Sequence, residues 1–208
     1  MGLRIRWTTE AVFLVAGILI ILLGWISDLI GALSGETGEA HDAGSLLNRI
    51  WFTFFGLVFV AGGVVYEKHW QLLNDSVLTK RYMVSFLYIA DGAFHLYALT
   101  DHRLELFPAA FFAVSAILQI LVGVLLPHLP KDLDAYWVAI PAFFIAAYVL
   151  TRTLPVWPIN TIEEVDAFGI VSKLTEILTI VLLLSEMREV RKAAVPAKTP
   201  SAPMAGPR

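Results

Sequence analysis

Six long apolar segments, separated by short polar stretches, run through the 208-residue chain. A transmembrane α-helix needs about 17–25 predominantly apolar residues to cross the hydrocarbon core of a bilayer. No polar stretch between the segments is long enough to form a soluble domain. The sequence therefore predicts an all-α, polytopic integral membrane helix bundle over residues 1–192, with transmembrane helices over residues 11–33, 50–66, 82–100, 107–126, 136–151 and 167–185.

Several segments carry further expectations. Cleavage of the first segment as a signal peptide would leave five spans, but its apolar run is longer than the roughly 7–15 residues of such peptides. Pro141 predicts a kink in the fifth span. Residues 67–81 are predicted to form a loop, and the Ala/Pro-rich tail 193–208 is predicted to be disordered.

The composition supports a membrane protein and excludes several functions. Hydrophobic residues make up 58% of the chain and charged residues 16%, compared with about 45–50% and about 25% in soluble proteins. The net charge of −3 is too small to favour nucleic acid as a partner. Because the chain has no cysteine, disulfides, thiolate metal sites and iron–sulfur clusters are excluded.

The distribution of lysine and arginine predicts the orientation of the chain. One set of span ends carries eleven of the 15 basic residues, namely Arg4, Arg6, Lys68, Lys80, Arg81, Lys131, Arg188, Arg191, Lys192, Lys198 and Arg208. The positive-inside rule assigns that side to the cytoplasm. We therefore expect a plasma-membrane protein with both termini cytoplasmic.

A stripe of ionisable residues follows the third span and its outer end. Asp91, His95, His102 and Glu105 fall within roughly 80° of one another if this stretch is helical. A charged group inside the hydrocarbon core costs at least about 2.5–3.5 kcal/mol. Ionisable residues at such positions are therefore candidates for a functional site.

A second stripe in the sixth span matches the first in depth. Lys173 and His95 lie at similar depths, as do Glu176 and Asp91. Because buried charges need partners, we expect the two stripes to face each other, with Lys173 as counter-ion of Asp91 or Glu176. Such a group could bind a proton, a cation or a small polar ligand, or it could be a structural ion pair between helices.

Two further candidates are polar side chains on neighbouring spans. Gln119 in the fourth span could line the cavity or hydrogen-bond a neighbouring helix. Arg152 at the outer end of the fifth span could bind an anionic group or extend to the lipid headgroups.

His102 and Glu105 are spaced to place two metal ligands on one helical face at the outer rim. Asp91, four residues before His95, is placed to orient the His95 ring. A rim metal would need more ligands, which His41, Asp42, Glu163 or Glu164 could supply. The sequence requires no cofactor, and no second span carries a histidine at a depth suited to haem.

Several of these residues also carry a resemblance. The order Gly92-x-x-His95, Asp101-His102-x-x-Glu105, Phe111-Phe112, Gln119, Thr151-Arg152-Thr153, Ser172-Lys173 and Glu176 resembles a pattern in uncharacterised bacterial multi-span membrane proteins, with aspartate at position 101 where that pattern has glutamate. The resemblance covers roughly residues 88–180. It implies that these polar residues belong together, and it implies no activity.

The leading hypothesis is an outward-opening polar site that binds or translocates a proton, cation or small polar ligand. The first alternative is a non-catalytic accessory or assembly subunit in which the buried charges are structural. A second alternative is a metal-dependent membrane redox subunit. The expected partners are the lipid bilayer and, in an oligomer, further membrane subunits. No enzymatic motif such as a phosphate loop or nucleophile elbow is present.

Overall fold

The structure, a computed structural model, describes residues 8–34, 43–157 and 159–194. This part of the chain is helical and contains no strand. Its long helices are α1 (Thr9–Ser34), α2 (Ala43–Asn74), α3 (Ser76–Asp101), α4 (Leu106–Leu125), α5 (Asp134–Thr153) and α6 (Ala167–Ala194). Within the described ranges, six helices are long and apolar enough to cross a membrane, which confirms the predicted all-α, multi-span class.

The predicted loop over residues 67–81 is wrong. Helix α2 continues to Asn74 and α3 begins at Ser76, so the break is a single residue, Asp75. The Asp75 carboxylate accepts a hydrogen bond from the backbone N–H of Leu78 at 3.0 Å and caps α3. Polar residues after an apolar run mark the edge of the bilayer, but a helix can continue beyond it. The predicted tail lies almost entirely outside the described residues.

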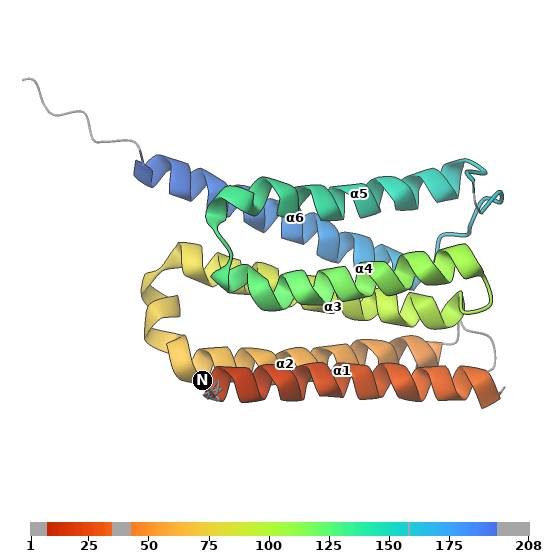
Figure 1. Ribbon diagram of the computed structural model, residues 1–208, viewed down its shortest axis with the longest axis horizontal. Helices are drawn as coiled ribbons and strands as arrows, with labels where there is room; N and C mark the ends of the chain where they lie inside the picture. The colour runs from red at the N-terminus through yellow and green to blue at the C-terminus, as the bar shows by residue number, and fades with distance from the viewer. Residues whose placement is uncertain (1–7, 35–42, 158, 195–208) are drawn as a thin grey trace, which may run out of the picture.

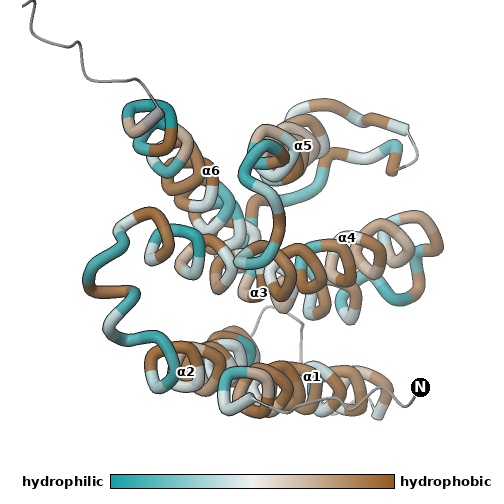
Figure 2. Tube along the Cα trace, turned by 60° about the vertical axis from the view of Figure 1, so that its left-hand side comes forward, coloured by the Kyte–Doolittle hydropathy of each residue, from teal (hydrophilic) through white to brown (hydrophobic). Residues whose placement is uncertain are grey.

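The helices run alternately in opposite directions along the long axis of the molecule (Figure 1). The pairs α1–α2 and α5–α6 lie on opposite sides of α3 and α4, and α3 occupies the centre (Figure 2). Helix α3 packs against α1, α2, α4 and α6. In the most apolar stretch of α3, 72% of the residues are buried inside the bundle, compared with 17–33% in the corresponding stretches of the other described spans. The ionisable stripe of α3 therefore faces protein rather than lipid.

Two glycines allow α3 and α4 to approach closely. A Cβ at Gly92 would lie 2.7 Å from Ile120 Cγ1 and 3.0 Å from the carbonyl oxygen of Ala116. A Cβ at Gly123 would lie 2.8 Å from the carbonyl oxygen of Ser85. Only glycine fits at such distances, and the close approach brings α4 against the polar face of α3.

Pro141 lies inside α5, which runs without interruption from Asp134 to Thr153. Because proline has no N–H, the carbonyl of Trp137, four residues earlier, loses its helical hydrogen bond. The Tyr88 hydroxyl of α3 donates to that carbonyl instead. A side chain from a neighbouring helix thus satisfies the backbone group that Pro141 leaves free.

Candidate functional site

Asp91 lies at the centre of a buried polar cluster that joins three helices. Its Oδ1 accepts a hydrogen bond from Ser172 Oγ of α6 at 2.7 Å, and its Oδ2 accepts one from Gln119 Nε2 of α4. Asp91 is 2% exposed and Gln119 is fully buried. The polar stripes of α3 and α6 therefore meet, as expected from their depths. The two side chains that donate to the Asp91 carboxylate are thus neutral, and Lys173 is neither of them.

Lys173 pairs with Glu176 on its own helix, so of the two predicted acceptors the structure selects the glutamate. Glu176 is 1% exposed, and its Oε2 has no hydrogen-bond partner in the described chain. Asp91 and Lys173 are the charged groups that act electrostatically on Glu176. Glu176 thus has a second buried carboxyl group, that of Asp91, as a neighbour, while the ammonium group of Lys173 bonds Glu176.

His95 is oriented by the backbone rather than by a carboxylate. Its Nδ1 lies 2.9 Å from the carbonyl oxygen of Asp91 and 4.0 Å from the Asp91 carboxylate. Because a carbonyl only accepts, Nδ1 carries a proton, and Nε2 of the neutral ring is an acceptor. The ring packs between Phe112 and Phe144, with centroid distances of 5.8 and 4.9 Å. The predicted orienting role of Asp91 is thus performed by its main chain.

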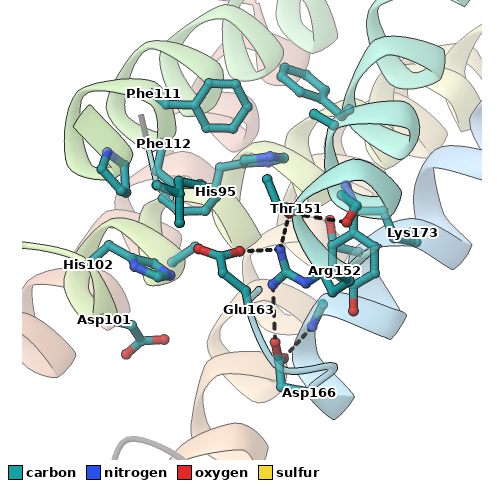
Figure 3. A pocket seen from close by; sticks show the side chains of 18 of the residues that line it. His95, Asp101, His102, Phe111, Phe112, Thr151, Arg152, Glu163, Asp166 and Lys173 are labelled. Atoms are coloured by element: carbon teal, nitrogen blue, oxygen red, sulfur yellow. Dashed lines mark hydrogen bonds and ion pairs between the residues drawn. The ribbon is translucent and has the colours of Figure 1, made fainter. Parts of the chain in front are cut away.

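A cavity of about 600 Å³ lies next to this cluster, between α3, α4, α5 and α6. His95 from α3 and Lys173 from α6 border it, together with Thr151 and Arg152 from the end of α5 (Figure 3). Nine aromatic side chains contribute to its largely apolar wall, namely Phe94, Phe107, Phe111, Phe112, Phe143, Phe144, Tyr148, Trp157 and Phe168. An apolar wall with a few converging polar groups is typical of a small-molecule site.

The predicted site residues divide into two sets. Those that line the cavity are His95, His102, Arg152 and Lys173. Those that lie behind or beside it are Asp91, Gln119, Glu176 and Glu105. The carboxylates expected to form the buried part of the site therefore support the wall residues. Ser172, which lines the cavity and bonds Asp91, connects the two sets.

Arg152 is held by protein groups at the outer end of the cavity. Its guanidinium pairs with Glu163, donates to Thr151 Oγ1 at 2.8 Å and lies 4.0 Å from the Tyr148 ring centroid. The backbone N–H of Glu163 also bonds the carbonyl of Thr151 at 3.0 Å. Through Glu163, Arg152 thus anchors residues 159–166 to α5, and its charge is already neutralised.

His102 Nδ1 and Glu105 Oε1 lie 3.4 Å apart at the rim. Within residues 8–34, 43–157 and 159–194 no three His, Asp or Glu side chains form a group able to hold a metal ion. Glu163 is engaged by Arg152, and the proposed additional ligands His41 and Asp42 lie outside the described residues. The rim metal site stays a prediction.

Sequence reasoning missed two buried arginines. Arg49 of α2 binds both oxygens of Asp28 on α1, at 3.0 Å, and of Asp101 on α3, at 2.7 Å. The sequence could have indicated this ion pair, because all three residues lie at the outer ends of adjacent predicted spans.

Arg81, predicted to lie in a loop, is 2% exposed near the other end of the bundle. It donates to Asp134 at 3.0 Å, to Glu186 at 2.8 Å and to two backbone carbonyls, those of Leu126 and Leu129. Its helical register with Ser85, Tyr88 and Gly92 could have placed it on the buried face of α3.

Comparison of the chain with protein-family models, with curated proteins and with solved structures finds no match in any of the three. The structure itself defines the class: a six-helix bundle able to span a membrane, with an aromatic cavity beside a buried polar cluster.

Proposed function

We propose that the protein binds a small ligand in the aromatic cavity, using His95, Ser172 and Lys173 as its hydrogen-bonding groups. The observation that carries this proposal is the convergence of these three side chains on one cavity of about 600 Å³. Ligand pockets typically measure about 300–1,000 Å³ and combine apolar walls with a few polar groups.

A pair of variants at adjacent positions of α5 tests this binding. Ala147 lines the cavity, whereas Ala146 is exposed on the outside of the bundle. We expect a screen of small molecules to find ligands that raise the melting temperature of the purified protein and of Ala146→Phe. Ala147→Phe, which fills the cavity, should lose that response. Ligands that stabilise both variants equally would place binding elsewhere and refute the proposal.

The cavity lies in the half of the bundle that we assign to the outside of the plasma membrane. The support is the predicted excess of lysine and arginine at the other ends, which places both termini in the cytoplasm. Because the chain has no cysteine, single cysteines can report the topology. An impermeant maleimide should label Glu164→Cys in intact cells and Lys192→Cys only after permeabilisation. The reverse pattern would invert the assignment.

Proton binding is a second candidate, because Asp91 and Glu176 are neighbouring buried carboxyl groups, Lys173 pairs with Glu176, and Glu176 Oε2 is buried without a hydrogen-bond partner in the described chain. Protonation of one carboxyl group would remove the uncompensated charge. Infrared difference spectroscopy during a pH step should then show a carboxylic acid band that Glu176→Gln removes. A band unaffected by that variant would refute the assignment.

An accessory role in an oligomeric membrane complex and a metal-dependent redox role are the remaining alternatives. The accessory role is favoured if Ala147→Phe leaves every ligand response unchanged. The redox role requires bound metal, so elemental analysis and the visible spectrum of the purified protein test it directly. Colourless, metal-free protein would remove it.

A further inference from the structure

The side of the cavity between α4 and α5 is closed by rings rather than by packed helices. Helices α4 and α5 are not among the closely packed helix pairs of the described chain. Phe111 of α4 instead meets Phe143 and Phe144 of α5, with ring centroids 6.5 and 5.8 Å apart. Phenylalanine side chains can rotate aside without breaking a hydrogen bond. This side can therefore open without unfolding either helix.

Two of these three rings are exposed. Phe111 is 37% and Phe143 59% exposed, on helices that are apolar enough to span the membrane, whereas Phe144 is buried. Phe107, one turn before Phe111, is also exposed. An entrance formed by these side chains leads from the hydrocarbon region of the bilayer into the cavity.

The route from the outer aqueous side is more obstructed. Trp157, which follows α5, packs against Phe107 with the ring centroids 5.8 Å apart. Residues 159–166 are tied to α5 by the pair Arg152–Glu163 and by the bond from the Glu163 N–H to the Thr151 carbonyl. Entry from water past these residues would require the polar contacts to break, whereas entry from lipid requires only apolar side chains to move.

The charges around the cavity favour a neutral ligand. The basic groups Arg49, Arg152 and Lys173 are each paired with a carboxylate. An anionic ligand at the deep end would meet Lys173 already neutralised and would approach the buried carboxyl of Glu176. The carboxylates that border the cavity, Asp101, Glu163 and Asp166, are in turn paired with Arg49 or Arg152, so a cationic ligand would meet no unpaired carboxylate among them.

Hydrogen bonding and ring stacking define the ligand further. Lys173 can donate to a carbonyl oxygen, and Nε2 of a neutral His95 can accept from a hydroxyl group. The aromatic walls, among them Phe112 and Phe144 on either side of His95, suit a flat ring, since aromatic pairs gain about 0.5–1.5 kcal/mol beyond area burial.

We propose that the cavity binds a neutral, lipid-soluble molecule whose flat ring carries carbonyl or hydroxyl oxygens, the chemistry of a quinone or quinol, and that this molecule enters from the bilayer between α4 and α5. The inference rests on the proposed ligand-binding function and adds the class of ligand and its route. It concerns binding alone.

The ligand class is tested with full-length protein in lipid nanodiscs and three probes: a decyl-substituted benzoquinone, dodecanoic acid and dodecyltrimethylammonium. Trp157, which lines the cavity, reports the quinone as the part of the saturable fluorescence quenching that Trp157→Phe removes. The two charged probes are followed instead by the rise in melting temperature that each causes in the parent and in Ala147→Phe. We expect the quinone to bind to the parent and to Ala146→Phe, and to bind about ten-fold or more weakly to Ala147→Phe.

The outcomes separate the two proposals. If a charged probe occupies the cavity in an Ala147-dependent manner and the quinone does not, the ligand class is wrong while the binding function stands. If no probe shows saturable binding that depends on Ala147, the ligand class is refuted. The small-molecule screen with the same variants then decides the binding function independently.

The route is tested by joining α4 to α5 across the entrance. Phe111→Cys combined with Phe143→Cys, joined by a flexible bis-maleimide, should slow quinone binding by about ten-fold or more compared with the same double variant left unjoined. An unchanged binding rate after complete cross-linking would overturn entry between these helices.

Discussion

Replacement of Asp91 separates a structural role of its charge from a structural role of its hydrogen bonds. The Asp91 carboxylate accepts one bond from Ser172 at 2.7 Å and one from Gln119. In Asp91→Asn the side-chain oxygen can still accept from Ser172, while the new amide becomes a donor toward Gln119. Gln119 Oε1 has no partner in the described chain, so a flip of that amide lets it accept from the asparagine.

The magnitudes follow from these contacts. Each exchange of a charge-assisted hydrogen bond for a neutral one lowers the free energy of unfolding by about 1 kcal/mol. Removal of a buried charge offsets part of that loss. Asp91→Asn should therefore destabilise by about 0–2 kcal/mol. Asp91→Leu leaves a hydroxyl and an amide without their acceptor, at about 1–3 kcal/mol each, for a total of about 2–6 kcal/mol.

The assay is reversible unfolding of the purified protein by dodecyl sulfate in mixed micelles, followed by circular dichroism. Ala146→Phe, altered on the lipid-facing side of α5, controls for effects of detergent and expression. Equal losses for the asparagine and leucine variants would refute the reasoning, because the charge itself would then hold the three helices together.

Of three further predictions, two use the same unfolding assay and one measures the yield of folded protein. Arg81→Met leaves two buried carboxylates without their cation and should destabilise by about 3–5 kcal/mol; a loss under 1 kcal/mol would contradict an uncompensated charge. Gly123→Leu should prevent α3 and α4 from closing and lower the yield of folded protein, whereas Gly62→Leu, where a Cβ meets nothing closer than 3.9 Å, should fold normally; equal yields would contradict the close approach. Tyr88→Phe removes the donor to the Trp137 carbonyl and should cost about 1–3 kcal/mol, and an unchanged stability would mean that this carbonyl finds another donor.

Much of the architecture could be predicted because it depends on segment length and polarity alone. Each apolar run must become a helix in lipid, since only a helix satisfies its own backbone hydrogen bonds there. The same reasoning placed Asp91 and His95 inside the bundle, because a charged stripe facing lipid would be too costly. It failed over residues 67–81, since polarity marks the bilayer edge but not the end of a helix.

The partners of the polar residues could be predicted only in part. The matching depths of the polar residues correctly predicted that the stripes of α3 and α6 would meet. It did not reveal that Lys173 would bond Glu176 on its own helix while Asp91 would bond Ser172 and Gln119. Depth fixes a residue along one axis, whereas hydrogen-bond partners depend on rotation and on spacing between helices.

The sequence by itself determined that this chain has six apolar helices with ionisable groups on the third and sixth, because the hydrocarbon core of a bilayer imposes its thickness on every span. Tertiary structure alone decided that α4 and α5 stand apart around a cavity while Gly92 and Gly123 draw α3 and α4 together. The physical reason is that lipid is as apolar as the helix surfaces. Hydrophobicity can place a helix in the membrane, but only steric fit and hydrogen bonding choose its neighbours.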